Sequence, residues 1–68
     1  MVYPNIKAEM ARKNLTVEGL SLVSGIKFST LSSKLNGKRD LTYPEAVKIK
    51  QALNVDIPLE TLFVEGAV

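Results

Sequence analysis

Four basic residues lie in one short stretch of the sequence with no acidic residue among them. They are Lys27, Lys34, Lys38 and Arg39, whereas residues 41–68 carry four acids against two lysines. Such a local excess of positive charge can face an anion, and the plain alternative is the solvated face of a helix. The chain has no His and no Cys, which excludes most general-base, thiol-nucleophile and transition-metal chemistry. We therefore expect a binding protein with no enzymatic activity, no cofactor and no metal site.

The composition is that of one small folded domain. The chain has 68 residues, of which 46% are hydrophobic and 24% charged, and a chain of this size buries about 60% of its unfolded surface. No apolar run approaches the roughly 18 residues of a membrane span, and the N-terminus lacks the order of a signal peptide. We expect a single cytoplasmic domain over residues 1–68, ordered over about residues 3–63, with no membrane partner and no small-molecule ligand.

Apolar residues at helical spacing predict an all-α chain of five short helices. The first helix is expected over about residues 4–13. The second begins after Thr16, whose hydroxyl suits a helix N-cap, and ends at Gly25, which accepts a positive φ without strain. The third continues from Ile26 to Leu35, with Lys34 and several small polar residues on its outer faces.

The second half of the chain begins with the turn signal Asn36–Gly37. Thr42 and Glu45 then have the spacing of a capping box, which predicts a fourth helix as far as Leu53. A last helix is expected over residues 59–63, and the tail from Val64 is expected to fray. The predicted core residues are Ile6, Met10, Leu20, Val23, Ile26, Leu31, Leu35, Ile49, Leu53, Leu62 and Phe63.

Residues 16–35 have the organisation of a helix-turn-helix: a capped short helix, a tight turn and a second helix. Gly25 can turn the chain, and Ser21 is small enough to let the second helix approach the first. Three apolar residues must then meet beneath the turn, namely Leu20, Ile26 and Leu31. The segment satisfies all of these requirements.

On these residues the chain resembles the phage repressor and Cro family of helix-turn-helix DNA-binding domains. The resemblance covers about residues 3–63, and it includes residues 3–13, the helix-turn-helix, the Leu35–Arg39 turn and the segment 56–63 in that order. It implies five helices, with the third in the major groove of DNA. It also implies a transcriptional regulator of phage or prophage type that works on double-stranded DNA as a homodimer.

The resemblance assigns two groups of residues to DNA. Lys can donate to guanine and Ser can bond several bases, while Phe28 can touch a thymine methyl or pack internally. The implied base-reading residues are Lys27, Phe28, Ser29, Ser32 and Ser33. The implied phosphate contacts are Thr16, Val17, Asn36, Gly37, Lys38 and Arg39. Val17 departs from the family pattern, because relatives often have Gln there and Val offers only its backbone N–H.

Two alternatives to a complete DNA-binding regulator remain open. Val17, Leu22 and Phe28 could form an exposed apolar patch, which would suit a helix-turn-helix scaffold that binds another protein. The chain could also be the DNA-binding domain of a longer protein. Salt separates DNA binding from the apolar alternative, because affinity for DNA falls steeply with ionic strength.

A homodimer on DNA is expected because one recognition helix contacts few base pairs. Two copies would place their third helices about 34 Å apart on a near-palindromic site. The fourth and fifth helices are the expected dimer surface, since the second and third are committed to DNA. The residues expected there are Val55, Ile57, Leu59 and Val64 to Val68.

Overall fold

The computed structural model describes residues 1–66 of the chain. Within these residues it has five helices and no strand. The helices are α1 (Pro4–Arg12), α2 (Val17–Ser24), α3 (Phe28–Leu35), α4 (Tyr43–Leu53) and α5 (Leu59–Leu62). The predicted all-α fold is confirmed. The boundaries differ by one or two residues, and the largest difference is that α3 begins at Phe28 and not at Ile26.

Hydrogen bonds from side chains begin two of these helices. Thr16 caps α2, since its hydroxyl oxygen accepts from the N–H of Gly19 at 3.1 Å. The predicted capping box of α4 is present: Thr42 Oγ1 accepts from the N–H of Glu45 at 3.3 Å, and Glu45 Oε1 accepts from the N–H of Thr42 at 2.9 Å. These local bonds satisfy backbone donors that a helix cannot pair internally.

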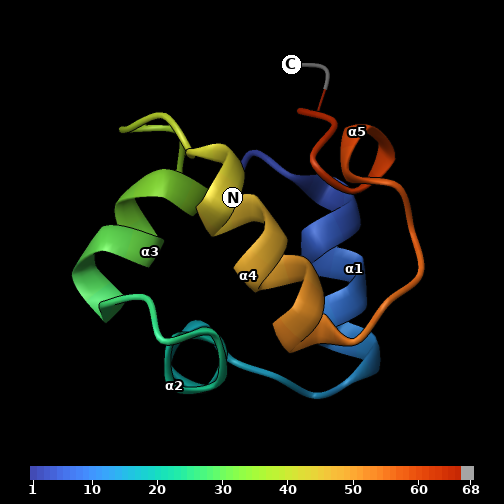
Figure 1. Ribbon diagram of the computed structural model, residues 1–68, viewed down its shortest axis with the longest axis horizontal. Helices are drawn as coiled ribbons and strands as arrows, with labels where there is room; N and C mark the ends of the chain where they lie inside the picture. Colours follow the sequence, from blue (N-terminus) through green and yellow to red (C-terminus); the bar gives the residue numbers. More distant parts are fainter. Residues whose placement is uncertain (67–68) are drawn as a thin grey trace.

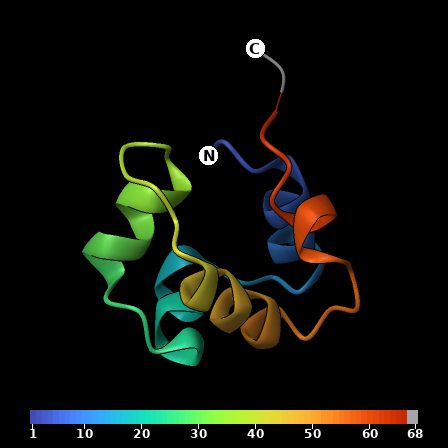
Figure 2. The same ribbon diagram turned by 45° about the horizontal axis from the view of Figure 1, so that its top comes forward.

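The helices separate into two sides around α4. Figure 1 shows α2 and α3 on one side of α4, with α1 and α5 on the other. Helix α2 packs against both α3 and α4, while α5 packs against α4 and α1. In Figure 2, α3 stands at the edge of the molecule away from α1 and α5. One long face of α3 is therefore open to a partner.

The core lies between these helices and contains most of the residues predicted for it. The buried hydrophobic residues are Tyr3, Ile6, Met10, Leu20, Ile26, Leu31, Leu35, Ile49, Leu53 and Leu62. Val23 was predicted inward and this is wrong, because its side chain is 62% exposed. The inward stripe of α2 follows positions 17, 20, 21 and 24, and position 23 lies about 110° from the centre of that stripe at 100° per residue.

Two aromatic residues from opposite ends of the chain meet at the edge of the core. Phe63 was predicted to be buried but is half-buried, packing edge-to-face on Tyr3 with ring centroids 5.4 Å apart. Tyr3 is a core residue that the helical pattern did not predict. Burial, with Glu65 and Asp40 nearby, raises the pKa of Tyr3.

The N-terminal segment joins the end of α3 to the C-terminal segment. The N–H of Val2 donates to the carbonyl of Leu35 at 2.9 Å, and the N–H of Gly66 donates to the carbonyl of Val2 at 2.8 Å. The segment that was expected to fray from Val64 thus has one backbone hydrogen bond to the N-terminal segment, at Gly66. Ala67 and Val68, which belong to the expected dimer surface, lie outside the described residues. Within residues 1–66, no helix has the length and apolar character that crossing a membrane requires.

Candidate nucleic-acid interface

A tight turn between α2 and α3 fixes the two helices relative to each other. Gly25 adopts the left-handed conformation with φ of 76°, and its N–H donates to the carbonyl of Ser21 at 3.0 Å. The hydroxyl of Ser21 donates to the carbonyl of Ile26 at 2.5 Å. The sequence indicated Ser21 for its small size, and the hydrogen bond gives it a second function in the turn.

Beneath the turn, three apolar residues meet as the helix-turn-helix requires. Leu20, Ile26 and Leu31 are all buried and belong to the same core cluster. Leu35 adds a second buried position one turn further along α3. The inner face of α3 is thus fixed in the core, and its outer face is left to solvent.

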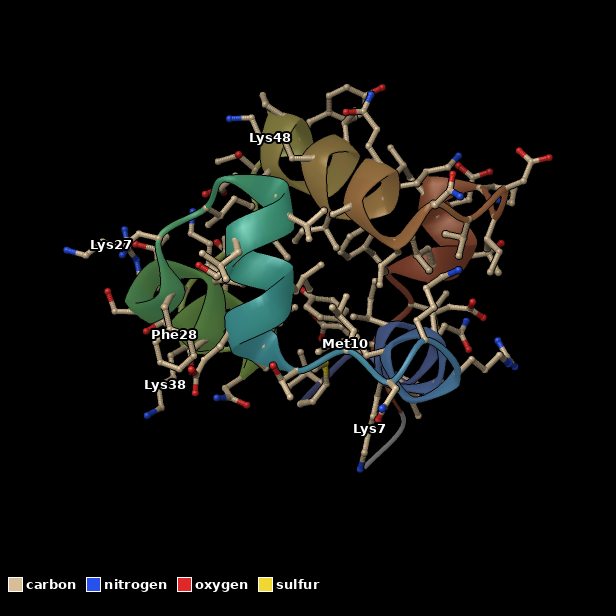
Figure 3. The ribbon with its side chains drawn as sticks, turned by 90° about the horizontal axis from the view of Figure 1, so that it is seen from below. Lys7, Met10, Lys27, Phe28, Lys38 and Lys48 are labelled. Carbon is tan, nitrogen blue, oxygen red and sulfur yellow. The ribbon has the colours of Figure 1, made fainter. Side chains whose placement is uncertain are left out.

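The outer face of α3 carries the residues that the sequence assigned to base reading. Phe28 and Ser29 are exposed, and Ser32 and Ser33 lie one turn further along and are half-buried. Lys27 precedes the helix and is exposed as well. Figure 3 shows Lys27, Phe28 and Lys38 on the side of the molecule away from α1 and α5. These side chains therefore share a surface of small polar, basic and aromatic groups.

The loop after α3 folds back onto the helix in a Schellman motif. Gly37 has φ of 77°, the N–H of Lys38 donates to the carbonyl of Ser33 at 2.9 Å, and that of Gly37 donates to the carbonyl of Lys34 at 3.2 Å. A Cβ on Gly37 would lie 2.9 Å from Cγ1 of Val2. The predicted turn is confirmed, and it holds the exposed residues Lys38 and Arg39 directly beyond the end of α3.

A family model described as helix-turn-helix matches residues 6–59. The chain belongs to this helix-turn-helix family. The match runs from α1 to the first residue of α5, so it includes the turn and both helices of the motif. The family consists of DNA-binding regulatory domains. Comparison with curated proteins gives no match, and neither does comparison with solved structures.

The resemblance to the repressor and Cro family also assigned a phosphate contact to the start of α2. Thr16 is exposed, although its hydroxyl oxygen already accepts from Gly19. Val17 is half-buried against the core, so only its backbone N–H, at the first position of α2, is suited to an anion.

The apolar patch predicted as an alternative surface is smaller than expected. Leu22 is 86% exposed and Phe28 is 47% exposed, and both line a shallow groove with Glu18 and Ser21. Val17 was assigned to this patch and this is wrong, because it packs against the core. Positions 17 and 22 lie about 140° apart around an α-helix, so they cannot share one face.

Lys34 differs most from its predicted place. It was expected on the outer face of α3, but it is only 8% exposed, and its Nζ lies 2.5 Å from Oε1 and 2.7 Å from Oε2 of Glu45. Position 34 lies on the same side of the helix as Leu31 and Leu35, and Glu45 on α4 neutralises the buried ammonium. Of the four basic residues in the stretch, Lys27, Lys38 and Arg39 remain exposed.

The contact with Lys34 lowers the pKa of Glu45. The hydrogen bonds from Lys34 lower the pKa of Glu45 to about 2, and the backbone N–H of Thr42 contributes in the same direction. The carboxylate is therefore ionised throughout the neutral range, and the ion pair persists there.

Proposed function

We propose that this protein binds double-stranded DNA at specific sequences and regulates transcription, in the manner of a phage or prophage regulator. It would act where its DNA lies, in the cytoplasm, and would catalyse no reaction. The observation that carries the proposal is the open outer face of α3, followed directly by an exposed basic loop, in a helix-turn-helix. An α-helix of this kind fits the major groove, whose base edges identify each base pair.

Base reading falls to the outer face of α3 in this proposal. Lys27 donates to guanine O6 and N7, and the serine hydroxyls donate to or accept from neighbouring bases. Phe28 contacts a thymine methyl, which its exposure and its absence from the core cluster support. The proposed base-reading residues are Lys27, Phe28, Ser29, Ser32 and Ser33.

Phosphate binding falls to the ends of the motif. Lys38 and Arg39 neutralise phosphates, while the side-chain amide of Asn36 donates a hydrogen bond. Gly37 contributes through its turn, since its N–H already donates to the carbonyl of Lys34. At the other end, Thr16 and the backbone N–H of Val17 approach the second phosphate position. Each neutralised phosphate contributes about 0.9 to the dependence of log affinity on log salt.

Two copies would bind one near-palindromic site. The proposed dimer surface includes Val55 and Leu59, which line a groove between α4 and α5 together with Tyr43. Tyr43 is 73% exposed and would lose water contact in such a dimer. The mass of the complex tests this: two chains per palindromic duplex are expected, and one chain per duplex at saturation contradicts the dimer.

A second candidate function is binding to another protein through Leu22 and Phe28. Leu22 is 86% exposed, and this favours the second candidate. Covering a large aliphatic side chain with a partner lowers the free energy of the complex. This contact would be apolar and would therefore depend little on salt.

Selection of random duplexes followed by sequencing tests the proposed function. We expect enrichment of a near-palindromic sequence, with affinity that falls steeply as salt increases. Lys38→Ala and Arg39→Ala should each weaken binding to every duplex and reduce the salt slope by about one. Ser29→Ala and Ser33→Ala should change the preference at particular base pairs instead. The absence of any enriched sequence and of any salt dependence would contradict DNA binding and favour the second candidate.

A further inference from the structure

The ion pair between Lys34 and Glu45 joins the recognition helix to α4. The Lys34 ammonium contacts both carboxylate oxygens of Glu45, at 2.5 and 2.7 Å. Only 10% of the Lys34 side chain and 19% of the Glu45 side chain are exposed. Lysine is rarely buried to this degree unless it has a partner, so the burial of this residue depends on Glu45.

The same carboxylate also begins α4. Oε1 of Glu45 accepts from the N–H of Thr42 at 2.9 Å and from its hydroxyl at 2.8 Å. One side chain therefore bonds the last turn of α3 and the first turn of α4. The segment between these two turns is residues 36–42, which contains the exposed cations Lys38 and Arg39.

Helix α3 has its main packing partner in α2, so the ion pair adds a contact to a different helix. Figure 1 shows the loop after α3 returning from the edge of the molecule to the start of α4. Glu45 therefore joins both ends of the loop backbone that carries Lys38 and Arg39.

We propose that Lys34 and Glu45 are positioning residues for DNA recognition: their ion pair fixes the recognition helix relative to the phosphate-binding loop and so sets sequence discrimination without touching DNA. This inference rests on the proposed DNA-binding function. Base contacts need groups held within a fraction of an ångström, whereas contacts to phosphate tolerate small displacements. Loss of the ion pair therefore affects binding to the preferred sequence more than binding to random sequence.

Lys34→Met separates this function from a direct contact with DNA. Met keeps the length of the buried stem and removes the charge, so the packing of α3 changes little. Lys34→Arg keeps the cation and can still contact both carboxylate oxygens. Lys48→Met is the matched control, because Lys48 is an exposed lysine on α4 that loses the same charge (Figure 3).

The experiment measures the dissociation constants of the full chain for the selected duplex and for a random duplex, at several salt concentrations and below the melting temperature of every variant. Discrimination is the ratio of the dissociation constant for the random duplex to that for the selected duplex. We expect Lys34→Met to lower this ratio by about fivefold or more, the equivalent of one lost base contact. Lys34→Arg should restore most of this ratio, and Lys48→Met should leave it at the parent value. The salt slope on random duplex should be the same for Lys34→Met and the parent.

Different outcomes separate failure of this inference from failure of the proposed function. A parent chain that binds no duplex contradicts both. A parent that discriminates, with an equal ratio in Lys34→Met, contradicts the inference alone. A salt slope lower by about 0.9 in Lys34→Met would mean that Lys34 contacts phosphate itself. If Lys34→Met does not fold, Glu45→Gln gives the same comparison, since Gln keeps the oxygen that accepts from Thr42.

Discussion

The two ends of α3 differ in how the protein holds them. At the C-terminal end, Leu35 is buried, its carbonyl accepts from Val2, the Schellman motif closes the helix, and Lys34 pairs with Glu45. At the N-terminal end, Lys27 stands at the N-cap position and makes no side-chain capping bond. The protein thus satisfies the C-terminal end of α3 and leaves its N-terminal end without a side-chain cap.

This difference has a physical meaning for recognition. Helices α2 and α4 each have a threonine cap, whereas α3, like α1 and α5, begins without a side-chain capping bond. The free N–H groups of the first turn favour an anion or an acceptor, while the fixed C-terminal end reduces the entropy lost on binding.

Leu31→Ala should have the largest effect, because Leu31 packs the inner face of α3 into the core. Leu31 is 1% exposed, and truncation of such a residue costs about 2–5 kcal/mol, enough to unfold much of a domain this small. Thermal and urea unfolding measure it. Leu22→Ala is the control on α2, where an 86% exposed side chain should change stability by less than about 0.5 kcal/mol. Equal melting of Leu31→Ala and the parent would contradict the assigned core.

Acid should weaken the fixed end of α3. The folded-state pKa of Glu45 is lowered from 4.5 to about 2, so its contribution to stability is complete above about pH 4.5 and is lost as the pH falls towards 2. The expected loss is about 1–3 kcal/mol. Urea unfolding at pH 6 and pH 3 measures it in the parent and in Glu45→Gln. An equally large decrease in Glu45→Gln would show that other groups cause the acid sensitivity.

Gly37→Ala should destabilise the protein by more than Gly25→Ala. Both glycines have φ near +76°, a conformation that costs an L-residue about 1–2 kcal/mol. A Cβ at Gly37 also meets Val2 at 2.9 Å, whereas a Cβ at Gly25 has nothing within 4 Å. The difference in the free energy of unfolding between the two variants reports the Val2 contact. Equal losses would contradict a close contact between the Val2 side chain and the turn at Gly37.

Lys27→Ser should have the smallest effect on stability. It should raise the free energy of unfolding, whereas the changes above lower it. A serine at the N-cap position gives α3 the side-chain bond that it lacks, which stabilises a helix by about 0.5–1 kcal/mol. The same change should weaken binding to DNA, because the first turn is then satisfied internally and a cation is lost. Lys27→Ala loses the cation without adding a cap, so it should weaken binding without the gain in stability. A more stable Lys27→Ser that binds as tightly as the parent would contradict the function of the open end.

The sequence predicted those parts of the structure that local chemistry determines. The Thr42 to Glu45 capping box and the Gly25 and Gly37 turns follow from bonds and dihedral angles within a few residues, and the structure has all of them. The apolar positions beneath the turn follow from helical spacing in the same way. Family membership, which the motif indicated, agrees with these local features.

Two of the differences from the prediction, at Tyr3 and Lys34, concern contacts between residues far apart in the chain. Tyr3 is buried because Phe63 packs on it from the other end of the sequence. Lys34 is buried because Glu45 on another helix compensates its charge, and a basic residue next to serines gives no sign of this. The prediction for Val23 was wrong for a different reason. Helix α2 is short, and which of its faces is buried depends on the side that α3 and α4 cover.

Amide chemical shifts of the full chain, recorded with and without the selected duplex, locate the surface that meets DNA residue by residue. We expect the largest changes at residues 27–33, at residues 36–39 and in the first turn of α2, with small changes in α1. Large changes confined to α1 and α5, with residues 27–33 unaltered, would contradict the claim that the outer face of α3 reads DNA.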